Sequence, residues 1–170
     1  ELSLVFFKLI QGSAPSYNNY ADIDRLLQTT THIAAGWDVN FAQVPAIAVG
    51  GKHGNACGAS VDDDPTEALK KMLEGDLRAI FGGLVMVNFE IDADLAEILL
   101  LHKVEKGRRL LDAVIAPSFT DEALELLKRK KDKSRILANP ALGKLTKDSL
   151  DTSVRTRYVR GGKLIQDNYT

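Results

Sequence analysis

Residues 48–60, AVGGKHGNACGAS, place a lysine, a histidine and the single cysteine of the chain on a backbone with four glycines. Lys52 supplies a cation, and His53 supplies an imidazole, a group that exchanges a proton near neutral pH. Glycine also allows backbone amides to approach a ligand closely. This combination predicts either a site for acid–base chemistry or, as is more usual for such a segment, a solvated turn.

Other kinds of site fit the segment less well. A P-loop would need a serine or threonine after Lys52, where His53 stands, and a different glycine spacing. A zinc deaminase would need a second cysteine near Cys57. A nucleophilic cysteine would need a base aimed at its thiol, so we interpret Cys57 as a small, half-buried side chain. His32 and His102 have no metal-ligand partner at helical or hairpin spacing, so the sequence predicts no metal site.

Strand-like and helix-like stretches alternate around this segment. Apolar runs predict strands at residues 2–10, 44–51, 83–89, 112–117 and 134–140. Amphipathic spacing and capping residues predict helices at 21–28, at 64–75 after Asp64, from Asp92, and from Thr120 into the basic run 128–131. Two apolar–polar runs around Gly161 and Gly162 predict a hairpin.

This alternation predicts a single α/β domain over residues 1–170, with three αβα layers around a mixed, largely parallel sheet. In such sheets, ligands bind beyond the carboxyl ends of strands. The Lys52–His53 segment directly follows the strand predicted at 44–51, so we expect it at a ligand site.

Composition narrows the classes of partner. The chain has 170 residues, 45% of them hydrophobic, and its 22 lysines and arginines nearly balance 23 acids. A net charge of -1 gives no electrostatic reason to expect nucleic acid or an anionic membrane, so we expect a small-molecule substrate. One cysteine forms no internal disulfide and no apolar run is long enough to span a bilayer, which favours the reducing cytoplasm.

Five blocks of this sequence, in the same order, resemble the AICAR transformylase domain of the bifunctional enzyme whose other half is IMP cyclohydrolase. They are SYNN (16–19), KHGNACGA (52–59), FGGLVMVN (81–88), DAVIAPSFTDEALELLKRKK (112–131) and VRGGKLIQD (159–167). The resemblance covers only the first half of that domain. The family's Arg-Tyr-Gly block is missing before SYNN, and Ala56 and Ala79 replace a proline and a serine of the family pattern.

The resemblance implies a cytidine-deaminase-like fold without zinc and formyl transfer from 10-formyltetrahydrofolate, the cosubstrate, to the 5-amino group of AICAR. It implies Lys52 and His53 as the catalytic pair. The substrate-binding residues that it implies are Gly82, Asp112, Asn19, Asn55 and Phe81. It further implies a homodimer, or docking of this chain to the missing half of the domain.

Two classes of function therefore remain. In the first, the chain is part of a formyltransferase whose site is completed by residues outside this sequence. In the second, it is a non-catalytic half-domain that binds a nucleotide or mediates assembly. Asp112 also has a purely structural interpretation, because an acid between a helix and a strand often caps or turns the chain.

Overall fold

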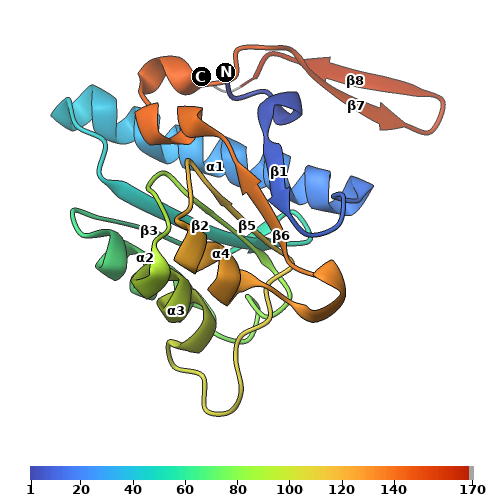
Figure 1. Ribbon diagram of the computed structural model, residues 1–170. Helices are drawn as coiled ribbons and strands as arrows, with labels where there is room; N and C mark the ends of the chain where they lie inside the picture. The colour runs from blue at the N-terminus through green and yellow to red at the C-terminus, as the bar shows by residue number, and fades with distance from the viewer. Residues whose placement is uncertain (169–170) are drawn as a thin grey trace.

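The computed structural model describes residues 1–168, and a 6-stranded sheet with the order β1-β6-β5-β4-β2-β3 lies at its centre (Figure 1). Strands β4, β5 and β6 are mutually parallel, whereas β2 joins β4, β3 joins β2, and β1 joins β6 in antiparallel pairs. The predicted mixed α/β sheet is confirmed. The strands are β1 (Lys8–Gln11), β2 (Ala46–Lys52), β3 (Asn55–Asp62), β4 (Leu84–Val87), β5 (Ala113–Ala116) and β6 (Arg135–Ala138).

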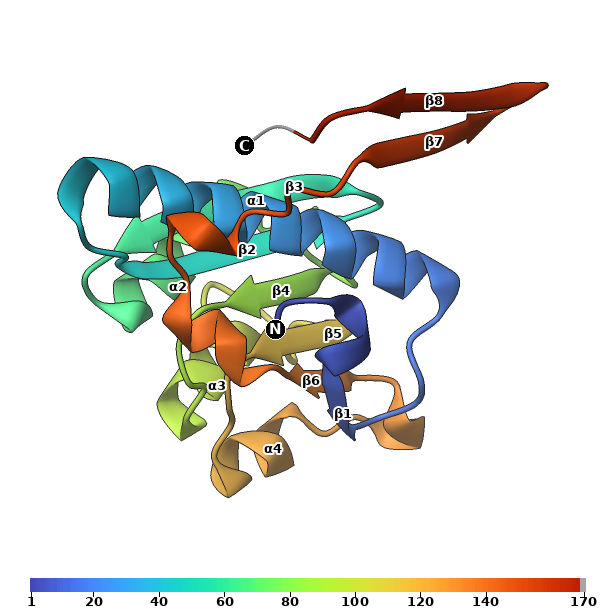
Figure 2. The ribbon, with the colours of Figure 1, turned by 90° about the horizontal axis from the view of Figure 1, so that it is seen from above.

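Helices cover both faces of this sheet. Helix α1 (Tyr17–Phe41) lies on one face, and α2 (Pro65–Gly75), α3 (Ala93–Leu101) and α4 (Asp121–Leu127) lie on the other (Figure 2). Each interface buries its own apolar cluster, so the sheet is apolar on both sides. Among residues 1–168, no helix has the length and apolar character needed to cross a membrane.

Three of the four predicted helix starts are confirmed by their capping bonds. The carboxylate of Asp64 accepts a hydrogen bond from the N–H of Thr66 at 2.9 Å, and Asp92 and Thr120 cap α3 and α4 in the same way. The predicted extension of the last helix into the basic run is wrong. Helix α4 ends at Leu127, and the chain continues through an extended Lys128 to the 3-10 helix η2 (Lys130–Asp132).

Two further predictions differ from the structure, and one strand was not predicted. Residues 2–10 do not form one strand, because the chain first closes a 3-10 turn, η1 (Leu4–Phe6), and pairs with β6 only from Lys8. Helix α1 is far longer than 21–28, since it starts at its cap Ser16 and ends at Phe41. Strand β3 was not predicted, yet it pairs with β2 along its whole length.

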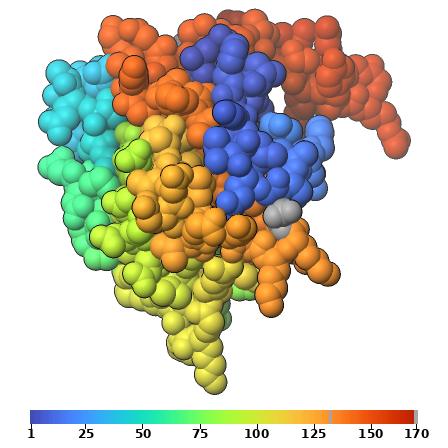
Figure 3. Space-filling view, in the orientation of Figure 1, coloured from blue at the N-terminus to red at the C-terminus, as the bar shows by residue number. Residues whose placement is uncertain are grey.

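The predicted carboxyl-terminal hairpin is confirmed and forms a separate 2-stranded sheet. Its strands, β7 (Arg155–Val159) and β8 (Gly162–Gln166), pair from Arg155–Gln166 to Val159–Gly162. The hairpin stands away from the body of the molecule (Figure 3). Two short 3-10 helices, η3 (Pro140–Lys144) and η4 (Lys147–Ser149), connect β6 to it along the α1 side.

The packing of α2 on β3 yields a stability prediction. A Cβ atom added at Gly58 in β3 would overlap the backbone carbonyl of Met72 in α2. Because a backbone group cannot move aside as a flexible side chain does, we expect Gly58→Ala to lower the free energy of unfolding by about 1–3 kcal/mol. Urea denaturation followed by circular dichroism measures the change.

The matched control is Gly36→Ala on α1, where an added Cβ meets no atom within 4 Å. Alanine favours a helix over glycine, so this variant should gain about 0.5–1 kcal/mol. Equal losses in both variants would contradict the close approach of α2 to β3.

Candidate functional site

The Lys52–His53 segment is a tight hairpin turn. Lys52 ends β2 and pairs with Asn55 at the start of β3, so only His53 and Gly54 lie between the strands. Their φ angles are 56° and 75°, the positive values that a type I′ turn requires at both central positions. The pairing of β2 with β3 continues up to the turn, so this glycine-rich segment has the geometry of a paired hairpin.

The structure brings this turn together with the two other predicted segments. The Nζ atom of Lys52 donates a hydrogen bond to the carbonyl oxygen of Phe81 at 2.9 Å. A Cβ atom added at Gly82 would lie 3.8 Å from the same Nζ. The N–H of Asp112 donates to the carbonyl of Gly83 at 2.9 Å, which places the start of β5 beside that of β4. The Lys52–His53 turn, Gly82 and Asp112 therefore lie at the same edge of the sheet.

The edge of the sheet at which they meet is not a set of carboxyl ends alone. Because β2 is antiparallel to β4, its last residues lie beside the first residue of β4, with Gly51 opposite Leu84. The site therefore combines the carboxyl end of β2 with the amino ends of β4 and β5. The expectation of a ligand site beyond strand carboxyl ends applies only to β2.

Of the remaining predicted residues, Asn19 and Asn55 make local hydrogen bonds, and Phe81 is exposed. The carboxamide oxygen of Asn19 accepts hydrogen bonds from the N–H and Oγ of Ser16, at 3.0 and 2.9 Å, and so fixes the start of α1. The Nδ2 atom of Asn55 donates to the carbonyl of His53 at 3.1 Å across the turn. The ring of Phe81 is exposed.

Asp112 lies next to a cation. Its Oδ1 atom is 3.7 Å from Nη1 of Arg129, whose guanidinium also donates to the carbonyl of Leu111 at 2.9 Å. The side chain of Asp112 remains 46% exposed, so its oxygens are accessible to a ligand. The Asp112 carboxylate is thus oriented by Arg129 and still open on one side.

An open pocket of about 500 Å³ adjoins the turn. Its lining includes three of the predicted site residues and a short connection after α2, of which the sequence analysis singled out only Ala79. The lining residues are Lys52, His53, Asn55, Ala56, Cys57, Gly75, Asp76, Arg78 and Ala79. Phe81, Gly82, Asp112 and Asn19 lie outside this lining.

The connection after α2 is stabilised by Asp76. Its Oδ1 atom accepts hydrogen bonds from the N–H groups of Arg78 and Ala79, at 3.0 and 2.9 Å, and these bonds lower the pKa of the carboxyl. Asp76 is therefore charged at the pocket wall. The sequence signal for this turn is an aspartate directly after a helix-ending glycine, because its carboxylate can accept N–H groups from the residues two and three positions further on.

The charges of Asp76 and Lys52 also affect the pKa of the Cys57 thiol. Burial raises the pKa of its thiol, the Asp76 carboxylate raises it further, and the Lys52 ammonium acts in the opposite direction. The thiol is therefore protonated near neutral pH, which agrees with the interpretation of Cys57 as a non-nucleophilic side chain.

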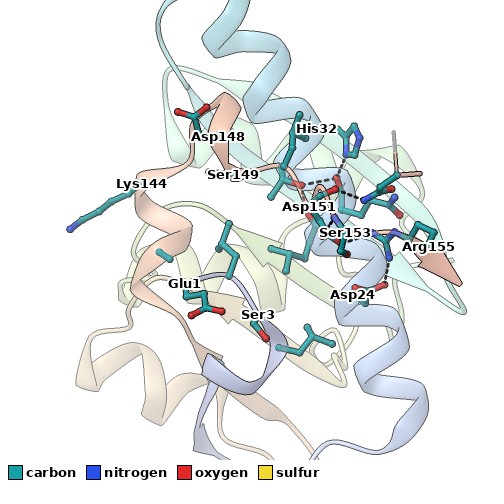
Figure 4. Close-up of a pocket in the computed structure, with 18 residues that line it drawn as sticks. Glu1, Ser3, Asp24, His32, Lys144, Asp148, Ser149, Asp151, Ser153 and Arg155 are labelled. Atoms are coloured by element: carbon teal, nitrogen blue, oxygen red, sulfur yellow. Dashed lines mark hydrogen bonds and ion pairs between the residues drawn. The ribbon is translucent and has the colours of Figure 1, made fainter. Parts of the chain in front are cut away.

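A larger cavity, of about 790 Å³, lies elsewhere, between α1, the amino-terminal segment and the chain around Arg155 (Figure 4). Arg155 pairs there with Asp24 at 3.4 Å and with Asp151 at 3.5 Å. None of the predicted site residues lines it. Within residues 1–168, no group of three or more histidine, cysteine or acidic side chains is placed to hold a metal ion.

The charges around Cys57 lead to a testable prediction. Asp76→Asn keeps the oxygen that accepts the two N–H groups but removes the charge, so the Cys57 pKa should fall and alkylation by iodoacetamide at pH 8 should accelerate. Lys52→Gln removes the opposing cation, so the pKa should rise and alkylation should slow. Rates that move together in both variants would contradict the placement of Cys57 between these groups.

Comparison with known proteins identifies the family. All of residues 1–170 match the family described as AICARFT/IMPCHase bienzyme. The chain is 38% identical over 168 residues to the bifunctional purine biosynthesis protein PurH of Anoxybacillus flavithermus, and 36% identical to the PurH proteins of Prochlorococcus marinus strain MIT 9515 over 161 residues and Listeria monocytogenes over 168. These alignments cover 99%, 94% and 99% of this chain.

In each case the alignment spans about 28% of the length of the relative. The match to the family extends from the first to the last residue of the chain, and it includes both the β2–β3 turn and the carboxyl-terminal hairpin. The chain therefore belongs to the AICARFT/IMPCHase bienzyme family.

Proposed function

We propose that this chain is the first part of an AICAR transformylase domain and that the Lys52–His53 turn takes part in formyl transfer from 10-formyltetrahydrofolate to AICAR during purine biosynthesis. Family membership supports the reaction, and one observation supports the site. The bond from Lys52 Nζ to the carbonyl of Phe81 joins two segments that are 29 residues apart, and both belong to blocks of the family resemblance. We place this function in the cytoplasm, because the single cysteine, Cys57, fits a compartment in which thiols stay reduced.

In this proposal, His53 acts as the general base and Lys52 stabilises the charge of the transition state. The aromatic 5-amino group of AICAR is a weak nucleophile, so His53 accepts its proton as the nitrogen attacks the formyl carbon. The new C–N bond forms, the bond from the formyl carbon to the folate nitrogen breaks, and that nitrogen receives a proton. Lys52 stabilises the negative charge that develops on the formyl oxygen.

The other residues hold the nucleotide. We assign Asp112 to the ribose hydroxyls, because its partly exposed carboxylate offers two acceptors beside the start of β5. Gly82 has a φ of 70° and no side chain, and so leaves room for the nucleotide next to Lys52. Asn55 lines the pocket beside the turn, Phe81 directly precedes Gly82, and Asn19 fixes the start of α1. The arrangement we infer is cytidine-deaminase-like, without zinc.

An assay of the purified chain, and of the full gene product that contains it, tests the proposed function. Each is mixed with AICAR and 10-formyltetrahydrofolate, and the release of tetrahydrofolate is followed. Release by either form supports the proposal. Binding of AICAR with no release by either form would instead support the alternative of a non-catalytic nucleotide-binding domain.

The catalytic pair yields its own prediction. In the form that transfers formyl groups, Lys52→Ala and His53→Ala should each remove about 2–4 kcal/mol of transition-state stabilisation. Circular dichroism should show an intact fold, because both side chains lie at the solvent-facing end of a hairpin. Cys57→Ala should leave kcat nearly unchanged. A dispensable His53 together with an essential Cys57 would indicate a thiol mechanism and overturn the assignment.

We further propose a homodimer in which the β7–β8 hairpin contacts a second copy; docking of the hairpin onto the rest of a longer protein is the alternative. Its apolar side chains are uncovered, with exposed fractions of 83% for Tyr158, 61% for Leu164 and 56% for Ile165. A lone two-stranded hairpin is marginally stable in water, so a covering surface would stabilise it.

The double variant Tyr158→Ser/Leu164→Ser tests this contact. Loss of buried side chains at the centre of an interface typically costs about 2 kcal/mol or more. In sedimentation equilibrium, the variant dimer should therefore dissociate at higher protein concentrations than the parent dimer. Leu126→Ser, an exposed leucine on α4, is the matched control and should leave the dimer intact. A parent chain that is monomeric at high concentration would contradict the homodimer.

A further inference from the structure

The β2–β3 turn is held from outside the hairpin by one side chain. The carboxylate of Asp22, on α1, accepts a hydrogen bond from the N–H of Gly54 at 2.6 Å, across 32 residues of sequence. Asp22 belongs neither to the blocks of the family resemblance nor to the residues assigned above. We propose that Asp22 is a positioning residue that fixes the conformation of the turn and thereby the placement of Lys52 and His53.

The turn needs such a contact because its conformation is unfavourable by itself. A left-handed backbone costs a residue other than glycine about 1–2 kcal/mol, and His53 adopts it with a φ of 56°. The two central residues of the turn also lie outside the β2–β3 ladder, so their N–H groups need other partners. A carboxylate is a strong acceptor for one of them.

Helix α1 holds Asp22 at a fixed place relative to the turn. The Ser16–Asn19 capping box defines the start of the helix, and Ile23, the residue after Asp22, is fully buried. One turn further along, Leu26 packs so closely on β2 that a Cβ atom added at Gly51 would lie 2.8 Å from its Cδ2 atom. The helix is thus fixed against the strand that carries Lys52.

The alternative is that Asp22 contributes stability alone, and α1 offers a matched control for this possibility. Asp38, on the same helix, also accepts a hydrogen bond from a distant backbone N–H, that of Lys147, at 2.8 Å. Its bond lies away from the β2–β3 turn. Asp38→Ala therefore removes the same kind of interaction without touching the site.

Two readouts test the proposal, which rests on the proposed function for its kinetic part. The first is hydrogen exchange at the Gly54 amide, measured by NMR on this chain. The second is the kcat and KM for formyl transfer, measured on the active form. Asp22→Ala should remove the protection of the Gly54 amide and lower kcat roughly 10- to 100-fold, as expected when a catalytic group is misplaced by about an ångström, with little change in KM. Asp38→Ala should change neither.

Asp22→Asn keeps an acceptor oxygen and should restore part of both the protection and kcat. Unchanged protection at Gly54 in Asp22→Ala overturns the proposal, and so does lost protection with the kcat of the parent. A fall in kcat in Asp38→Ala as large as in Asp22→Ala would reduce the role of Asp22 to stability and also overturn it. If the parent transfers no formyl group, the proposed function fails, and exchange at Gly54 alone then decides whether Asp22 holds the turn.

Discussion

The antiparallel pairing of β2 with β4, from Ala48–Val87 to Gly51–Leu84, determines where the chemistry-bearing residues lie. In an all-parallel sheet, the residues after β2 and those before β4 would be at opposite edges. Here the reversal of β2 puts its last residue, Lys52, beside the segment that leads into β4. The parallel pairing of β4 with β5 then adds Asp112 to the same edge.

Both helical layers converge on the end of β2 that leads to this edge. On one side, a Cβ atom at Gly50 would come within 2.7 Å of the Met72 sulfur in α2, and on the other, Gly51 lies against Leu26 of α1. Successive residues of a strand face opposite sides of the sheet, so two adjacent glycines allow close approach on both faces. These glycines allow the close packing that fixes the strand.

Local signals predicted the elements that depend on local interactions. The caps Asp64, Asp92 and Thr120 are each bonded within their own first turn, so the sequence was enough to place them. The later part of α1 was not predicted, because residues 29–31 are three threonines that favour strands. In the structure their hydroxyls bond to carbonyls of the preceding turn, and Ala34 is fully buried, so tertiary packing extends the helix.

For the site, the sequence supplied the residue types and the family resemblance supplied their grouping, but neither could supply Asp22, whose partner is 32 residues away. That contact changes the physical character of the site. When a ligand orders a flexible loop, the loss of backbone conformational entropy costs about 1–2 kcal/mol per residue. In a hairpin turn held by Asp22 from α1 and by Asn55 across the turn, this loss has already occurred during folding. In the function that we propose, interactions of Lys52 and His53 with a ligand are therefore not offset by the ordering of the backbone that carries them.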